Sequence, residues 1–183
     1  AGKINQNDIN EEAIKESEMI FLEGYLWDKG EAKSAFDKAM SFSNTKAMSL
    51  SDQFCVERHK NDFYDLVRNR LDIIFANEQE IKSLIDAKNF EEVVEFGKQI
   101  GKILIITRGE KGSVAIKNKK IIECKSKTNL KIVDLTGAGD LFAAGFLHGF
   151  INNISTKEAL EKGTEMSSKI IQMVGARLDG ITE

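Results

Sequence analysis

The chain of 183 residues carries 26 lysines and arginines against 29 aspartates and glutamates, a net charge of −3. This length suits one domain, and a slightly acidic chain lacks the basic footprint of a nucleic-acid-binding protein. No apolar run reaches the roughly 18 residues of a membrane span, and Cys55 and Cys124 lie far apart without a C-x-x-C spacing. These features predict a cytoplasmic protein with reduced thiols and neither a nucleic-acid nor a membrane partner.

Strands and helices are predicted to alternate along the chain. Apolar runs predict strands at 19–22, 46–50, 73–76 and 103–106, a hairpin of 114–117 with 120–124, and a last short strand that ends at Val133. Helical spacing and capping residues predict helices at 10–17, 31–42, 56–70, 78–85, 90–100, 140–151 and 155–174. The alternation indicates an α/β fold, with a mostly parallel sheet between helices on both faces and ligand sites at the carboxyl ends of the strands.

Three residues that attract attention in the sequence have ordinary explanations. Trp27 lies in the turn E-G-Y-L-W-D after the first strand, and we expect it to pack under a loop rather than to contact a ligand. His59 lies in the charged run E-R-H-K, which predicts a solvated side chain rather than a metal ligand. His148 has no histidine or cysteine near it in the sequence and is given no metal role.

The segment N-E-Q-E follows the third predicted strand directly. Asn77 is a favourable helix N-cap, and Glu80 stands where the acid of a capping box is found, so a simple helix start would explain both residues. The segment T-R-G-E-K-G follows the fourth strand from Thr107 to Gly112, and two glycines at that place could form no more than a hairpin turn.

The most informative stretch is D-L-T-G-A-G-D-L-F-A-A-G-F, which begins at Asp134. Gly137, Ala138 and Gly139 are small enough for a turn whose backbone approaches a ligand, and the helix that follows would direct free amides and the positive end of its dipole at an anion. Asp140 is unexpected beside a phosphate unless it takes a proton from an attacking hydroxyl. An aspartate favoured in the first helical turn by the dipole alone is the alternative.

This stretch resembles the C-terminal signature of the ribokinase-like (PfkB) family of carbohydrate and nucleoside kinases, with Leu135 where threonine is common. The resemblance implies a ribokinase-like fold, of which this chain is the C-terminal portion, and ATP-dependent phosphoryl transfer to an alcohol. In that scheme Asp140 is the base, and the amides of Ala138, Gly139 and Asp140 hold the developing charge. No G-x-x-x-x-G-K-[ST] motif of the rival P-loop kinases occurs in the sequence.

The same resemblance assigns roles to the other motifs. N-E-Q-E is similar to the family's N-x-x-E motif, so Asn77 and Glu80 would organise Mg²⁺ through water. T-R-G-E-K-G is similar to its T-x-G-x-x-G turn, which contacts ATP and here comprises Thr107, Gly109 and Gly112. Thr164 and Ser168 lie where the adenine pocket is expected, although an ordinary amphipathic helix explains them equally well. Asp134, Thr136 and Gly175 match a site for a monovalent cation such as K⁺.

The acceptor is expected to be a nucleoside or a sugar. E-G-Y-L-W-D and S-L-S-D-Q-F-C-V-E-R resemble bacterial adenosine-kinase-like members, which favours adenosine, with a ribose or fructose kinase as the alternative. The residues resemble only the C-terminal half of the family, so residues 1–183 are expected to form its nucleotide-binding part, without the N-terminal half that carries the lid and most acceptor contacts. Such a half could bind nucleotide without catalysing, and could self-associate through an exposed sheet edge.

Overall fold

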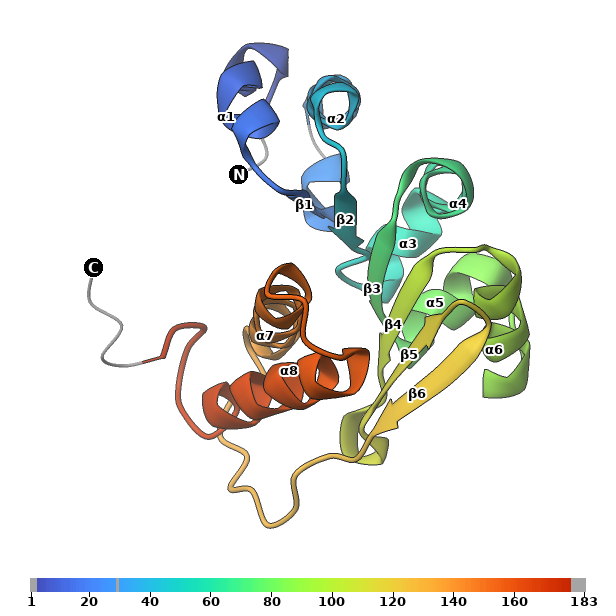
Figure 1. Ribbon diagram of the computed structural model, residues 1–183, viewed down its shortest axis with the longest axis vertical. Coiled ribbons are helices and arrows are strands. Elements are labelled where there is room, and N and C mark those ends of the chain that lie inside the picture. The colour runs from blue at the N-terminus through green and yellow to red at the C-terminus, as the bar shows by residue number, and fades with distance from the viewer. Residues whose placement is uncertain (1–2, 29, 179–183) are drawn as a thin grey trace. The chain divides into compact units, whose positions relative to one another are not determined.

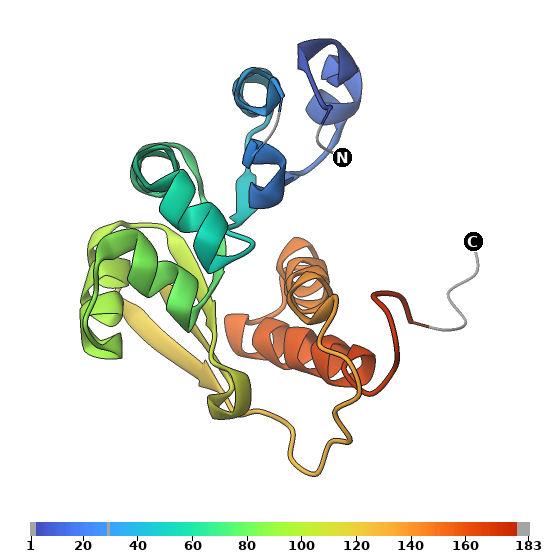
Figure 2. The ribbon, with the colours of Figure 1, turned by 180° about the vertical axis from the view of Figure 1, so that it is seen from behind.

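The computed structural model describes residues 3–28 and 30–178 (Figures 1 and 2). Its strands are β1 (Ile20–Glu23), β2 (Lys46–Ser49), β3 (Ile73–Asn77), β4 (Ile103–Thr107), β5 (Ser113–Lys117) and β6 (Lys120–Cys124). Its helices are α1 (Glu11–Glu16), α2 (Ala32–Phe42), α3 (Gln53–Arg58), α4 (Lys60–Asp65), α5 (Glu78–Ile85), α6 (Phe90–Gln99), α7 (Ala138–Ile151) and α8 (Thr156–Ile170). Single helical turns cover Gln6–Asp8, Gly24–Asp28, Leu66–Arg70 and Gly109–Lys111.

The strands form a six-stranded sheet in the order β1-β2-β3-β4-β5-β6. The pairs β1–β2 and β2–β3 are parallel, with Leu22 opposite Met48 and Met48 opposite Ile74. Helices connect these strands, as a parallel connection requires. The predicted α/β class is therefore confirmed.

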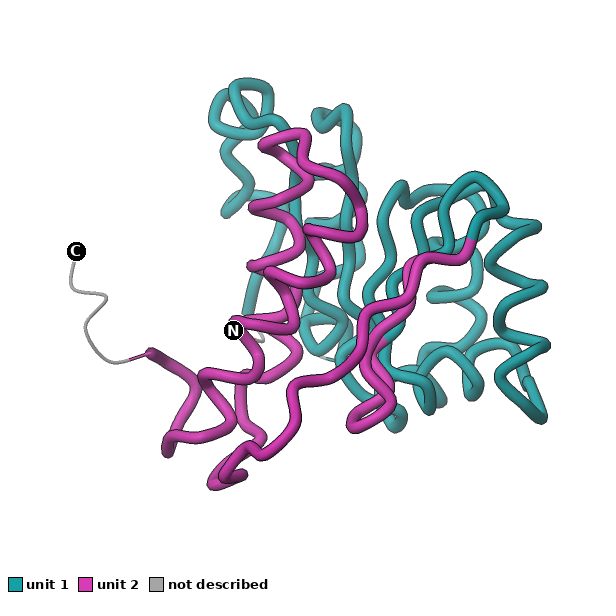
Figure 3. The backbone as a smooth tube through the Cα atoms, turned by 60° about the horizontal axis from the view of Figure 1, so that its bottom comes forward, with its two compact units in different colours: residues 1–106, 116–120 teal, residues 107–115, 121–183 magenta. Residues whose placement is uncertain are grey.

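Two compact units make up the chain, shown in different colours in Figure 3. Unit 1 comprises residues 1–106 and 116–120, and it holds β1 to β4 with helices α1 to α6. Unit 2 comprises residues 107–115 and 121–183, and it holds the turn after β4, most of the β5–β6 hairpin, and helices α7 and α8.

The core of unit 1 consists of the strands and the apolar faces of the helices. Ile73 and Ile74 of β3 are fully buried, which explains its continuous apolar sequence. The predicted inner face of α2 is buried as expected, and Trp27 packs edge-on against Phe36 and Phe63, with ring centroids 5.1 and 5.8 Å away. The packing role predicted for Trp27 is thus confirmed.

The prediction of one continuous helix over residues 56–70 is wrong, because the helical structure is interrupted there. Helix α3 starts earlier, at Gln53, because the Asp52 side chain accepts a hydrogen bond from the amide of Cys55 and caps it. The chain bends at His59, whose backbone is not helical (φ −117°, ψ 25°), and α4 begins beyond it. The residues predicted to face inward, including Phe63 and Leu66, are nevertheless buried.

The hairpin in the second half matches the prediction. Asn118 and Lys119 both have positive φ, 51° and 63°, which is the two-residue turn that suits the twist of a hairpin. In unit 2, helices α7 and α8 pack closely, because Gly145 lies against Gly163: a Cβ added at Gly145 would come within 2.9 Å of the Gly163 backbone.

The strand expected to end at Val133 is absent from the described structure. Residues 131–135 have no regular structure, and Ile132, Val133 and Leu135 are 58%, 47% and 65% exposed. The amides of Val133 and Asp134 donate instead to the carbonyl of Ile171, just beyond α8. An apolar run forms a strand only when another strand pairs with it, so the G-A-G-D turn does not follow a strand here. No helix among the described residues combines the length and apolarity needed to cross a membrane.

Candidate active site

In unit 1, Asn77 and Glu80 form the predicted capping box at the start of α5. Asn77 Oδ1 accepts hydrogen bonds from the amides of Gln79 and Glu80, both at 2.9 Å. Glu80 returns two contacts, because its carboxylate accepts from the Asn77 amide N–H at 2.8 Å and from Asn77 Nδ2 at 2.5 Å. The box fixes the Glu80 side chain at the carboxyl end of β3.

Glu80 differs from an ordinary capping glutamate because it is only 5% exposed. Its pKa is raised to about 7, mainly by burial and also by the charges of Asp52 and Glu23, although the Asn77 hydrogen bonds act to lower it. Three carboxyl groups of unit 1 therefore act on one another in a partly desolvated place. Such an arrangement is relieved by a cation, and carboxylate and amide oxygens are the ligands that Mg²⁺ accepts. The residues present thus fit the expected metal.

Glu23, Ser51 and Asp52 were not among the residues expected at the site. Glu23 ends β1 and Ser51 closely follows β2, so both stand at the same edge of the parallel sheet as Asn77. The Ser51 hydroxyl donates to Glu23 and accepts from the Tyr25 amide at 3.0 Å. The sequence did contain a signal for these site residues, because they are polar and follow neighbouring parallel strands at their carboxyl ends, where ligands bind in such sheets.

The backbone around Ser51 is tightly constrained. Ser51 has φ 76°, a left-handed conformation that non-glycine residues rarely adopt. Gly24 packs directly on it, and a Cβ there would come within 2.7 Å of Ser51 Oγ. Tyr25 adjoins this contact, and its pKa is raised to about 12, first by burial and then by a hydrogen bond to Asp52. Positive φ at a non-glycine residue is typical of functional sites held by their surroundings.

In unit 2, the turn after β4 has the conformation that its glycines permit. Gly109 and Gly112 have φ 56° and 89°, and the Arg108 amide donates to the Gly112 carbonyl at 2.8 Å. A side chain at Gly112 would collide with the carbonyl of Cys124. The second glycine is therefore required by packing in this structure. Thr107 is the last residue of β4.

The G-A-G-D segment opens α7 as predicted. Gly137 is the N-cap with φ 78°, and a Cβ there would come within 3.0 Å of Ala176. Around Gly139 there is open space within 4 Å of the position of a Cβ, and Asp140 is exposed in the first helical turn. The Ala138 amide donates to the Leu135 carbonyl at 3.2 Å, so it would have to release that bond to hold an anion. The next amides of a helix start lack intrahelical acceptors and suit that role better.

The residues expected at the monovalent-cation site lie together. Asp134 accepts hydrogen bonds from the amide and hydroxyl of Thr136, at 2.9 and 2.7 Å, and from the amide of Gly175 at 2.9 Å. These contacts lower the pKa of Asp134, that from Gly175 most, so its carboxylate is ionised. Gly175 has φ 94°, which favours glycine there. The bond from Gly175 joins the segment before α7 to the one after α8.

Thr164 and Ser168 both face the interior of unit 2, at 7% and 8% exposure. Thr164 Oγ1 lies 3.5 Å from Cys124 Sγ, and the Ser168 carbonyl accepts from Gln172. Ordinary helix burial accounts for both, so their expected place beside adenine stays a prediction.

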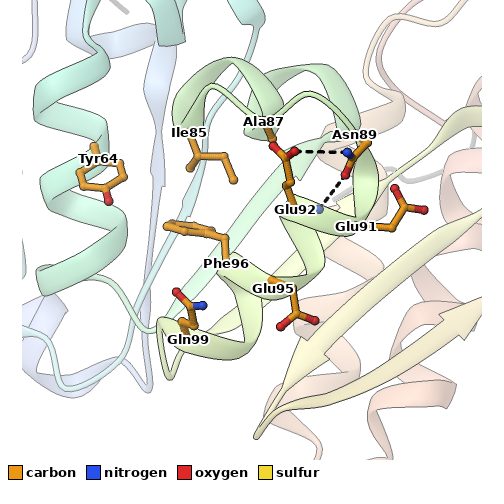
Figure 4. Close-up of a pocket in the computed structure, with 9 residues that line it drawn as sticks. All are labelled: Tyr64, Ile85, Ala87, Asn89, Glu91, Glu92, Glu95, Phe96 and Gln99. Carbon is orange, nitrogen blue, oxygen red and sulfur yellow. Dashed lines mark hydrogen bonds between the residues drawn. The ribbon is translucent and has the colours of Figure 1, made fainter.

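Figure 4 shows a surface hollow of unit 1 that contains none of the expected site residues. Helix α6 and the loop before it line most of it, with Ile85 at the end of α5 and Tyr64 of α4 at one side. Asn89 and Glu92 hydrogen-bond each other there as the N-terminal cap of α6, which explains their presence structurally.

His59 was predicted to be solvated, and this is wrong: its side chain is 20% exposed and its Nε2 lies 2.8 Å from Asp28 Oδ1.

Two solved structures that are similar to the chain are described as kinases. The adenosine kinase from Sinorhizobium meliloti is 33% identical with a TM-score of 0.94, over 97% of this chain and 56% of that one. A protein from Rhizobium etli described as a probable sugar kinase is 34% identical with a TM-score of 0.92, over 95% and 54%. These matches confirm the predicted ribokinase-like fold.

Sequence relatives give the same assignment. The 5-dehydro-2-deoxygluconokinase of Clostridium botulinum is 24% identical over 92% of this chain and 54% of its own length. The chain thus spans about half the length of the curated relatives it matches. The family described as pfkB family carbohydrate kinase matches residues 2–182. The chain therefore belongs to the PfkB family of carbohydrate kinases.

Proposed function

We propose that this protein transfers the γ-phosphoryl group of ATP to a hydroxyl of a nucleoside or sugar. The observation that carries the proposal is the start of α7, where the backbone at Gly139 is open and Asp140 is exposed beside it. A helix start with an open backbone suits a phosphate, and a carboxylate at the same place suits the removal of a proton.

Asp140 would accept the proton of the attacking hydroxyl, and the amides of Gly139 and Asp140 would stabilise the charge that develops on the transferred group. Asn77 and Glu80, together with the neighbouring Glu23 and Asp52, would hold Mg²⁺ directly or through water. When bound, this ion would neutralise charge on the phosphates. Thr107, Gly109 and Gly112 would contact the nucleotide, and Thr164 and Ser168 its base.

Asp134, Thr136 and Gly175 would support the anion site from the side. Their mutual hydrogen bonds hold the segment that leads into Gly137. A monovalent cation near Asp134 would add to the positive potential at the start of α7.

We propose adenosine or a related nucleoside as the acceptor. This preference rests on the segments around Gly24–Asp28 and Asp52 and on the 33% identity to an adenosine kinase. A sugar acceptor is the second candidate, favoured by the 34% identity to a protein described as a probable sugar kinase. Because the chain matches about half the length of its relatives, we propose that residues 1–183 supply the nucleotide side of the reaction and that the acceptor side lies in the other half.

The decisive experiment is Asp140→Asn in the full-length protein, with ADP release followed for adenosine, ribose and fructose. Turnover should fall roughly 10²- to 10⁴-fold while ATP affinity changes little, because the variant keeps the shape but loses the base. Glu91→Gln is the control, since it removes an exposed charge from the first turn of α6. Turnover of Asp140→Asn within a few-fold of wild type would refute the assigned base, and the preferred acceptor decides between the two candidates.

The role of residues 1–183 is tested on this chain alone. Calorimetry should detect ADP or ATP binding, and ADP release with any of the three acceptors should be negligible, because little remains to position a hydroxyl or to exclude water. Robust acceptor-dependent turnover by this chain would place the acceptor site within these residues.

A further inference from the structure

Three potential metal ligands of different chemical type lie together in unit 1, where the Gly24–Asp28 turn meets α3. They are an oxygen of Asp28, the sulfur of Cys55 and a ring nitrogen of His59, and all lie within 4.8 Å of one another. Cys55 lies in α3, and His59 is the residue at which that helix ends, where its backbone amide donates to the Cys55 carbonyl at 3.1 Å. This last turn holds the two residues near each other, and Asp28 approaches from the Gly24–Asp28 turn. His59 Nε2 is already 2.8 Å from Asp28 Oδ1.

The surroundings of this cluster suit an ion that enters from solvent. Cys55 is fully buried and is not in a disulfide, and its thiol donates to the carbonyl of Gly24 at 3.3 Å. The side chains of His59 and Asp28 are 20% and 27% exposed. The Cys55 sulfur therefore forms the inner end of the cluster, and the His59 nitrogen and the Asp28 oxygen form its outer rim. A water molecule at that rim could complete a tetrahedral set of four metal ligands.

Arg58 fixes the orientation of the carboxylate. Its Nε and Nη2 donate to the two oxygens of Asp28, at 3.0 and 2.5 Å. Hydrogen bonds of this kind orient the ligands of metal sites from outside the coordination shell. With Cys55 as a thiolate, the Asp28 carboxylate and the sulfur would carry two negative charges. Arg58 supplies one positive charge beside them, so a bound divalent ion would leave the site with a small net charge.

We propose that Asp28, Cys55 and His59 bind a borderline-soft divalent ion such as Zn²⁺. A thiolate, an imidazole and a carboxylate together select Zn²⁺ over Mg²⁺, which prefers oxygen ligands alone. On binding, the Cys55 S–H bond breaks, its proton passes to the buffer and the thiolate sulfur bonds to the metal. The pKa of Cys55 is raised to about 11, first by burial and then by the charges of Asp28 and Asp52, so the thiol keeps its proton until the ion displaces it.

The ion would fasten the Gly24–Asp28 turn to α3. That turn packs through Gly24 on Ser51, beside the carboxyl groups near Glu80. The proposal is independent of the kinase activity, because none of the three ligands belongs to the residues assigned to phosphoryl transfer.

The test uses Co²⁺ as a spectroscopic substitute for Zn²⁺ on the metal-free, reduced full-length protein. With excess Mg²⁺ present to occupy sites made of oxygen ligands, wild type should bind one equivalent of Co²⁺. The bound Co²⁺ should show thiolate-to-cobalt charge-transfer absorption in the near ultraviolet, which Zn²⁺ removes. Cys55→Ser should lose this absorption, whereas Cys124→Ser, which alters the other cysteine, should keep it.

His59→Gln is the second variant, because its position is partly exposed and its fold is less at risk than that of a Cys55 variant. Its Co²⁺ affinity should fall at least 10- to 100-fold, the loss typical of even an outer-shell change. His148→Gln should bind as wild type. Absence of the absorption in reduced wild type, its persistence in Cys55→Ser, or unchanged affinity in folded His59→Gln would each overturn the proposal.

Discussion

Replacement of Glu80 by glutamine tests the buried carboxyl group at the centre of the unit 1 site. The glutamine oxygen can still accept from the Asn77 amide, but the side chain no longer titrates. The perturbation therefore removes a charge while the capping box largely remains. Its effect is read from the pH dependence of the free energy of unfolding, in metal-free buffer.

The sign follows from where the proton is held. Burial raises the pKa of Glu80 from 4.5 to about 7 in the folded protein. Between these values the folded state keeps a proton that the unfolded state has lost, so stability is full below pH 4.5 and falls as the pH rises through 7. At about 1.4 kcal/mol for each pKa unit, wild type should lose up to about 3 kcal/mol relative to Glu80→Gln over this interval.

The assay is urea unfolding followed by circular dichroism at several pH values, for wild type and variant. Glu158→Gln is the matched control, because Glu158 occupies the same capping-box position in α8 but is exposed, and its pKa is lowered by Ser155. The free energy of unfolding of wild type, relative to Glu158→Gln, should not fall between pH 4.5 and 7. If wild type also shows no fall relative to Glu80→Gln over this interval, the burial argument is refuted. If Mg²⁺ binds there, it should stabilise wild type more at pH 8 than at pH 6.

Three further substitutions test other parts of the structure. Gly139→Val should weaken Mg-ATP binding at least 10-fold by calorimetry while the melting temperature stays nearly constant, because only open space surrounds that Cβ; equal affinity would show that the turn is merely structural. Gly145→Val should lower the free energy of unfolding by about 1–3 kcal/mol or more, measured by urea unfolding, because its Cβ would come within 2.7 Å of the Lys162 carbonyl. Trp27→Ala should lower the free energy of unfolding by about 3–5 kcal/mol, measured by urea unfolding followed by circular dichroism. A loss below about 1 kcal/mol would contradict the core position of Trp27.

Local signals in the sequence were sufficient for most elements and for the backbone of the site. The capping boxes at Asn77 and Ser155 and the hairpin turn at Asn118 depend on residues within a few positions, so they could be predicted without the fold. The same holds for the turn at Gly137, which needs a positive φ. The motif at 134–146 was also enough to predict the family.

Other features depend on which segments the fold brings together. Glu80 reads as an ordinary cap in the sequence, and only the tertiary structure buries it and sets Glu23 and Asp52 near enough to raise its pKa. His59 lies in a charged run, yet packing against the Gly24–Asp28 turn half-buries it beside Asp28. Burial and charge pairing are properties of contacts distant in sequence, and no local pattern contains them.

The segment before Gly137 shows the same limit for secondary structure. Its apolar residues predict a strand at 131–133, but a strand requires a neighbour with matching register, and the backbone amides there bond to Ile171 instead. Helix starts and tight turns satisfy their hydrogen bonds locally, so the sequence by itself determined them. Strand pairing, the burial of Glu80 and the gathering of Asp28, Cys55 and His59 join distant residues, and only the tertiary structure decided them.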